Sequence, residues 1–93
     1  SEDYPGPSTV MRTAQDDEYL QDLKNQGITV DGVEDSLIGT GKSLCQGKAE
    51  TGRVDPVLAR AVAGQLAQQG KASQDTKQTS TILTNTAVKH YCQ

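Results

Sequence analysis

The stretch VEDSLIGTGKSLCQGK, residues 33–48, decides the fold of this chain. Its apolar residues recur at intervals of three and four, which predicts one face of a helix. That face ends at Cys45, and the second cysteine, Cys92, is the next-to-last of 93 residues. A distant cysteine pair in a short chain is typical of a structural disulfide, which needs an oxidising compartment. We therefore expect a Cys45–Cys92 disulfide in an exported protein. The alternative is two buried, reduced thiols.

Three further helices are predicted around this segment, over residues 16–27, 56–70 and 73–91. The clearest start is Asp55-Pro56, because aspartate is a favoured N-cap and proline is favoured as the first helical residue. No other segment has the length or the alternation of a paired strand. The sequence therefore predicts an all-α fold of four short helices.

The details of the first helix and of the link after it are also predicted. This helix should start near Asp16 or Asp17, whose carboxylates can cap its free amide groups. The β-branched run over residues 28–32 has no partner strand in the sequence, and we expect an extended link. Its Ile28 and Val30 are expected to fill the core.

Two predictions concern the later helices. The inner face of the third should consist of apolar residues at helical spacing, namely Leu58, Ala61, Val62 and Leu66. The start of the fourth, residues 74–81, is rich in Thr and Gln and has poor intrinsic helix propensity. Tertiary packing must decide whether that start is helical.

Length and composition allow one domain with a thin core. Apolar residues make up 33 % of the chain, and Phe and Trp are missing, so a crosslink would add greatly to stability. The chain-entropy model gives roughly 4 kcal/mol for a disulfide that closes nearly half the chain. Residues 1–14 hold two of the three prolines and no apolar periodicity. We expect a flexible leader there and a helical domain over residues 15–93.

Charge is divided unevenly between the two parts of the chain. Residues 1–41 carry nine acidic and two basic side chains, a balance of −7, and residues 42–93 carry seven basic and three acidic ones, a balance of +4. A nucleic-acid-binding protein would show a concentrated basic face and a high pI. The sequence therefore argues against nucleic acid as a partner, and no apolar run is long enough to span a membrane.

The segment Gly39-Thr40-Gly41-Lys42-Ser43 resembles the end of a phosphate-binding loop. Such a loop follows a buried strand and opens with an earlier glycine, but that position is Ser36 and no strand precedes it. We therefore expect Lys42 to be an exposed helix residue and no nucleotide to bind.

His90 and Tyr91 are the remaining candidates for chemistry. Either could ligate a haem iron from the end of a helix, and Cys45, His90 and Cys92 with one carboxylate could in principle hold zinc. A disulfide would make both sulfurs unavailable to a metal. The simpler interpretation is that the ring of Tyr91 packs in the core and that His90 lies at its edge. We expect no metal and no cofactor.

Several of these segments together resemble a known family. They are Asp17-Glu18-Tyr19-Leu20 with Gly27-Ile28, Gly41-Lys42-Ser43-Leu44-Cys45, and the final Tyr91-Cys92. The chain from Asp16 to Gln93 resembles the small secreted actinobacterial, mostly mycobacterial, domain-of-unknown-function family numbered seven hundred and thirty-two. The resemblance implies an exported or lipid-anchored helical domain with one disulfide, which maps onto Cys45 and Cys92. It implies no activity and no catalytic residue.

No group of residues amounts to a reaction, so we expect no enzyme. The leading expectation is an exported, non-enzymatic binding or interaction module of the cell envelope or medium, with an envelope or extracellular protein as its partner. The rival is a small-ligand carrier of the haem type that uses Tyr91 or His90. A hydrolase with an unrecognised site is a third hypothesis.

Overall fold

The stretch that predicts the central helix forms most of α2 (Glu34–Thr51). The computed structural model describes residues 12–92, where the other helices are α1 (Ala14–Asn25), α3 (Pro56–Gln68) and α4 (Thr76–Tyr91). The predicted all-α class is therefore confirmed. The predicted disulfide joins Cys45 and Cys92, whose Cα atoms lie 5.2 Å apart. The predicted leader lies almost entirely outside the described residues.

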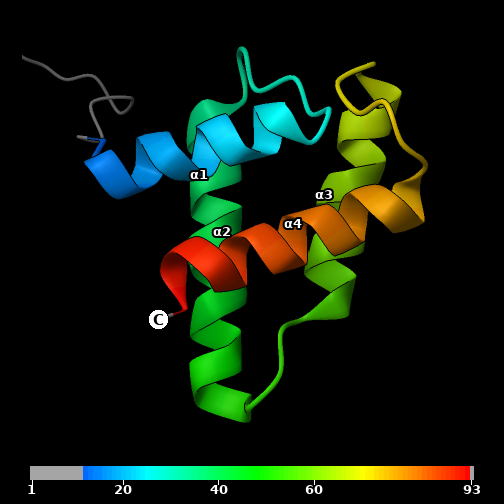
Figure 1. Ribbon diagram of the computed structural model, residues 1–93. Helices are drawn as coiled ribbons and strands as arrows, with labels where there is room; N and C mark the ends of the chain where they lie inside the picture. The colour runs from blue at the N-terminus through cyan, green and yellow to red at the C-terminus, as the bar shows by residue number, and fades with distance from the viewer. Residues whose placement is uncertain (1–11, 93) are drawn as a thin grey trace, which may run out of the picture.

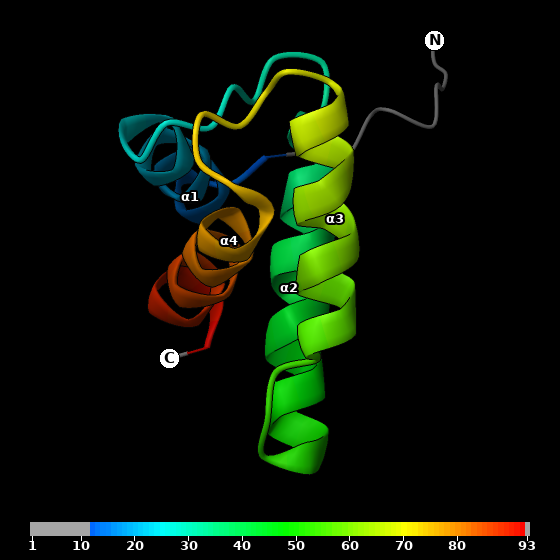
Figure 2. The ribbon, with the colours of Figure 1, turned by 90° about the vertical axis from the view of Figure 1, so that its right-hand side faces the viewer.

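The four helices form two layers (Figures 1 and 2). Helices α2 and α3 lie side by side and run antiparallel in one layer, and α1 and α4 cross them in the other. Helix α4 contacts all three other helices, whereas α1 and α3 do not contact each other. The core therefore lies around α4, between the two layers.

The core is aliphatic, with one aromatic ring fully inside it. The link after α1 contributes Ile28 and Val30, which are 2 % and 3 % exposed, as predicted. Ile28 also pairs with Ala72 in an isolated antiparallel bridge, so the link has the partner that the sequence did not reveal. The buried apolar residues are Tyr19, Leu20, Leu23, Ile28, Val30, Leu37, Ile38, Leu44, Ala59, Ala63, Leu66, Leu83 and Ala87.

Helix α1 begins two residues before the predicted start, because a different residue caps it. The Thr13 hydroxyl accepts a hydrogen bond from the Asp16 amide (3.1 Å), and the Asp16 carboxylate accepts one from the Thr13 amide (3.1 Å). This is a reciprocal capping box. The prediction that Asp16 or Asp17 is the N-cap was wrong, since Asp16 occupies the third helical position. Gly27 has a φ of 95° just after the C-cap, which confirms the predicted stop.

Two predictions for the later helices need correction. Of the predicted inner face of α3, Leu66 is buried and Leu58 and Val62 pack against the core, but Ala61 is exposed, and Ala59 and Ala63 are buried in addition. Helix α4 starts at Thr76 rather than Ser73, because the Asp75 carboxylate accepts a hydrogen bond from the Gln78 amide (2.8 Å). This N-cap accounts for a helix in the Thr-rich stretch.

Candidate functional site

The titratable side chains gather where the end of α4 meets α1 and α2. We call this group the α4-end cluster. Helix α1 contributes three members, α2 one and α4 two: Asp16, Tyr19, Asp22, Lys42, His90 and Tyr91. The Cys45–Cys92 disulfide lies beside them, because Cys92 directly follows Tyr91. The structure thus brings together all four site residues predicted from the sequence.

Asp16 is a carboxylate with no exposed surface. The Tyr91 hydroxyl donates to it at 2.6 Å, and the Lys42 ammonium lies 3.8 Å away. Burial alone raises the pKa of the Asp16 carboxyl, but the bonds from Tyr91 and Thr13 and the charge of Lys42 together hold that pKa below its ordinary value. Asp16 is therefore a buried anion whose charge is stabilised by hydrogen bonds from within the fold.

Tyr19 is the fully buried tyrosine of the α4-end cluster. Burial raises the pKa of its hydroxyl, and this hydroxyl has no hydrogen-bond partner within residues 12–92. The Tyr19 and Tyr91 rings pack with their centroids 4.9 Å apart. A Cβ on Gly41 would lie 2.8 Å from the Tyr19 ring and 2.9 Å from the Tyr91 ring. Gly41 therefore permits the close contact between the helices that a glycine on a buried face predicts.

Asp22 forms a second pair with α4, six residues after Asp16 on α1. His90 Nε2 lies 2.9 Å from an Asp22 carboxylate oxygen, and because a carboxylate only accepts, this nitrogen is the donor. The bonds from His90, Lys89 and Gln26 outweigh the effect of partial burial and lower the pKa of Asp22. The Gln15 side chain also donates to the His90 carbonyl.

These contacts define what His90, Tyr91 and Lys42 do in the fold. The Tyr91 ring packs on the core and the His90 side chain is 13 % exposed, in agreement with the simpler interpretation of the sequence. Lys42 is exposed as predicted, but it also lies 5.9 Å from the centroid of the Tyr91 ring. Residues 12–92 contain no group of three His, Cys, Asp or Glu side chains placed to hold a metal ion.

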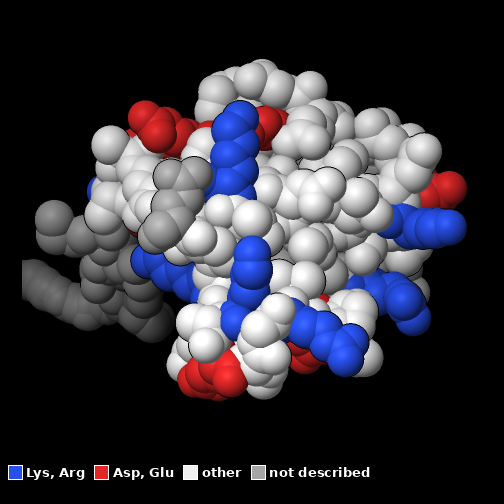
Figure 3. Space-filling model, turned by 60° about the horizontal axis from the view of Figure 1, so that its bottom comes forward, with Lys and Arg blue, Asp and Glu red and all other residues white. Residues whose placement is uncertain are grey.

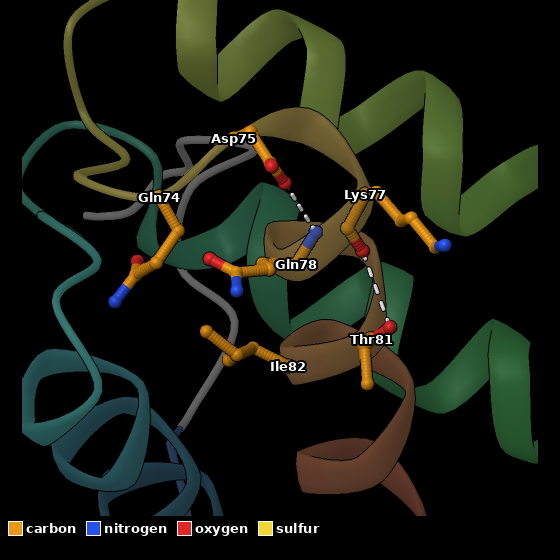
Figure 4. A pocket seen from close by; sticks show the side chains of 6 residues that line it. All are labelled: Gln74, Asp75, Lys77, Gln78, Thr81 and Ile82. Carbon is orange, nitrogen blue, oxygen red and sulfur yellow. Dashed lines mark hydrogen bonds between the residues drawn. The ribbon is translucent and has the colours of Figure 1, made fainter.

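A second feature is an open hollow at the start of α4, which we call the α4-start hollow (Figure 4). Its volume is 540 Å³, and its lining residues are Gln74, Asp75, Lys77, Gln78, Thr81 and Ile82. The side chains of Gln74, Gln78 and Ile82 lie on one side of the helix, whereas Lys77 points away from them. Gln74 is fixed, because it donates to the Gln26 carbonyl at 3.0 Å and accepts from Ser73 at 3.1 Å.

The sequence contained signals for both features that its interpretation missed. Asp16 lies three, four and seven residues before Tyr19, Leu20 and Leu23, so helical spacing places it on the apolar face and Asp17 off it. The spacing of Gln74, Gln78 and Ile82 by four residues likewise places them on one stripe.

Fold and site together define a small helical domain with a disulfide at the end of its last helix. Residues 15–93 match the family described as protein of unknown function (DUF732), and the chain belongs to this family. No curated protein and no solved structure matches it. Among the described helices, none combines the length and apolar character that a bilayer crossing requires.

Proposed function

We propose that this protein is an exported, non-enzymatic interaction module that binds its partner at the α4-start hollow. The observation that carries the proposal is the contrast in how side chains are used along α4. The titratable groups at its end bond to other residues of the fold, whereas Gln78 at its start has no side-chain hydrogen bond within residues 12–92. Groups without internal partners are the ones available to another molecule.

The chemistry of the hollow suits a polar protein segment. The Gln78 carboxamide offers two donors and an acceptor, which is the complement of a peptide group. Ile82 is half-buried beside it and offers apolar contact. All lining residues come from one short stretch of chain, so the hollow is open rather than enclosed. A protruding side chain or loop of a partner fits this shape better than a small ligand, which usually needs an enclosed cleft.

The absence of catalysis is part of the proposal. General acid–base chemistry needs a titratable group that reaches the substrate. His90 Nε2 bonds to Asp22, and the Tyr91 hydroxyl bonds to Asp16, so neither polar atom is directed at a ligand. Because these two strongest candidates for a catalytic group are engaged in contacts within the fold, the arrangement supports a binding role rather than catalysis.

Export and an envelope or extracellular partner are supported by the disulfide, because disulfides persist in oxidising compartments. The charge distribution supports a protein rather than a nucleic acid as partner. On the face drawn in Figure 3, Lys and Arg side chains are spread from one side to the other, and acidic side chains lie beside them at the top and at the bottom. A nucleic-acid-binding face would instead concentrate basic side chains.

Site-specific photocrosslinking tests the proposal. A photoreactive residue replaces Gln78 in the hollow, and in a control variant it replaces Gln65, an exposed glutamine on α3. Both are exposed to an extract of the cell envelope. A defined partner crosslinked from position 78 and not from position 65, and lost when Ile82→Ala is added, supports the hollow as the binding surface. Equal crosslinking from the two positions contradicts it, as does no crosslinking from either.

The haem-type carrier is the alternative function. To ligate iron through its hydroxyl oxygen, Tyr91 would have to give up its hydrogen bond to the buried Asp16 carboxylate. His90 could ligate iron only through Nδ1 as long as its Nε2 remains bonded to Asp22. A haem titration followed in the Soret region tests this alternative. A saturable one-to-one shift that Tyr91→Phe or His90→Ala abolishes would favour the carrier over the interaction module.

A further inference from the structure

The disulfide lies in the wall of a hollow rather than inside the core. This hollow has a volume of 340 Å³ and is lined by Cys45, Lys48, Ala49, Tyr91 and Cys92. Both cysteines are only half-buried. A small thiol can therefore approach the sulfur atoms without unfolding the domain.

The two sulfurs differ in their surroundings. The Cys45 sulfur lies on α2, 3.6 Å from the Ala87 carbonyl oxygen, whereas Cys92 is the C-cap of α4. A Cys45 thiol would therefore have a hydrogen-bond acceptor within the fold. Of the two possible mixed disulfides, this favours the one on Cys92, which leaves Cys45 as the thiol.

Lys48 supplies a charge to the same hollow. Its side chain is exposed and has no ion-pair partner within residues 12–92. The nucleophile in thiol–disulfide exchange is a thiolate. A cation in the same hollow attracts this thiolate, most strongly when the rest of the thiol compound is also anionic.

We propose that the Cys45–Cys92 disulfide is an exchange site at which Cys92 takes up an external, anionic, low-molecular-weight thiol. The thiolate attacks the Cys92 sulfur, the bond between the two cysteines breaks, and its electron pair moves to the Cys45 sulfur. Cys45 then takes up a proton from the solvent, which replaces the one that the external thiol lost on becoming a thiolate, and donates it in a hydrogen bond to the Ala87 carbonyl oxygen. The external sulfur is oxidised, the Cys45 sulfur is reduced, and the product is a mixed disulfide on Cys92.

The first experiment measures the rate of disulfide reduction in the native, full chain with two probes. One is anionic 2-mercaptoethanesulfonate and the other is cationic cysteamine. The ratio of the two rates is compared between wild type, Lys48→Glu and Lys24→Glu, an exposed control on α1 with the same charge change. We expect Lys48→Glu to lower the ratio of the anionic-probe rate to the cationic-probe rate about fivefold, because it replaces an attraction to the anionic probe with a repulsion at an exposed position. Lys24→Glu should leave this ratio unchanged. An equal ratio in all three proteins overturns the proposal.

The second experiment locates the bound thiol. After brief reaction the free cysteine is alkylated, and tryptic peptides are identified by mass spectrometry. We expect the probe on the peptide that contains Cys92 and the alkyl group on the peptide that contains Cys45. The reverse assignment overturns the proposal. It is also overturned if the reduction rate does not depend on thiol concentration and equals the rate of global unfolding, because the native hollow would then play no part.

Discussion

The two ends of α4 are attached to the rest of the molecule by different contacts. At its C-terminal end, two α1 carboxylates bond to Tyr91 and His90, and Cys92 is linked covalently to α2. At the start, the Asp75 N-cap, the bonds of Gln74 and the buried Thr79 hold the helix, while its exposed side turns polar side chains into an open hollow. The end of α4 thus holds the fold together, and its start carries the surface that we assign to binding. Substitutions at the two ends should therefore differ in their effect on stability.

The largest expected effect is loss of the crosslink at the end of α4. Replacing both Cys45 and Cys92 with Ser should lower the free energy of unfolding by about 3 to 4 kcal/mol, because the unfolded chain regains the freedom of a long loop. Denaturant unfolding of the variant and of the oxidised wild type measures the difference. Two free thiols in the native, unreduced wild type would refute the crosslink itself.

The second effect concerns the buried carboxylate. Asp16→Asn should cost about 2 to 3 kcal/mol, because the amide brings donors to a site that already faces donors from Tyr91 and Thr13. The matched control is Asp17→Asn, an exposed residue of the same helical turn, which should change stability by less than about 0.5 kcal/mol. Equal losses of stability in the two variants would show that only the loss of a negative charge from the first turn of α1 matters, and not the burial of Asp16.

The same carboxylates set the response to acid. The folded state lowers the pKa of Asp16 and of Asp22, so each binds protons less readily in the folded than in the unfolded chain. Their contribution to stability is present above the unfolded value of about 3.9 and is lost as pH falls through the lower folded values. Because asparagine does not titrate, Asp16→Asn should show a shallower loss of stability below about pH 4 than wild type.

The third prediction compares two glycines of α2. Gly41→Ala places a methyl group against the Tyr19 and Tyr91 rings, and overpacking of this kind costs about 1 to 3 kcal/mol. Gly39→Ala meets nothing within 4 Å and should stabilise the helix by about 0.5 to 1 kcal/mol. Thermal unfolding of both variants measures the contrast. A stabilising Gly41→Ala would mean that the rings can move apart freely.

The sequence predicted most of the fold, since apolar spacing and caps act locally. The Asp55-Pro56 start, the Gly27 stop and the disulfide follow from rules that need only neighbouring residues or a cysteine count. The burial of Ala59 and Ala63 on α3 did not follow from such rules. Small side chains allow close helix packing, and which of them are buried depends on the partner helix.

The candidate site was only half predictable. His90 and Tyr91 were identified as the chemically capable residues, but their partners Asp16 and Asp22 lie 75 and 68 residues away in the sequence. Helical spacing indicates that Asp16 faces inward and gives no information on which hydroxyl meets it. The four-residue spacing of Gln74, Gln78 and Ile82 places the lining of the α4-start hollow on one stripe, but it does not indicate whether another part of the chain covers that stripe.

The fourth prediction compares Tyr91, whose hydroxyl donates a hydrogen bond to Asp16, with Tyr19, whose hydroxyl has no partner in the described residues. Tyr91→Phe removes a donor from a buried carboxylate and should cost about 1.5 kcal/mol. Tyr19→Phe removes a buried hydroxyl without a partner in the described residues and should leave stability unchanged or raise it by up to about 1 kcal/mol. Denaturant unfolding distinguishes the two. A clear loss with Tyr19→Phe would indicate that its hydroxyl is bonded in solution.

The smallest effects test the two ends of α4 with one chemical change. Gln26 at the end of α1 donates to Thr86 of α4 at 2.9 Å and to the Asp22 carboxylate at 3.0 Å, so Gln26→Ala should cost about 1 kcal/mol. Gln78→Ala at the open start should stay within about 0.5 kcal/mol of wild type, because the side chain is exposed and alanine is an equally good helix former. Since both variants lose the same carboxamide, the difference between their free energies of unfolding isolates the contacts of Gln26. A loss of stability with Gln78→Ala as large as that with Gln26→Ala would mean that the Gln78 side chain also forms a stabilising contact within the fold. The α4-start hollow would then not offer a free side chain to a partner.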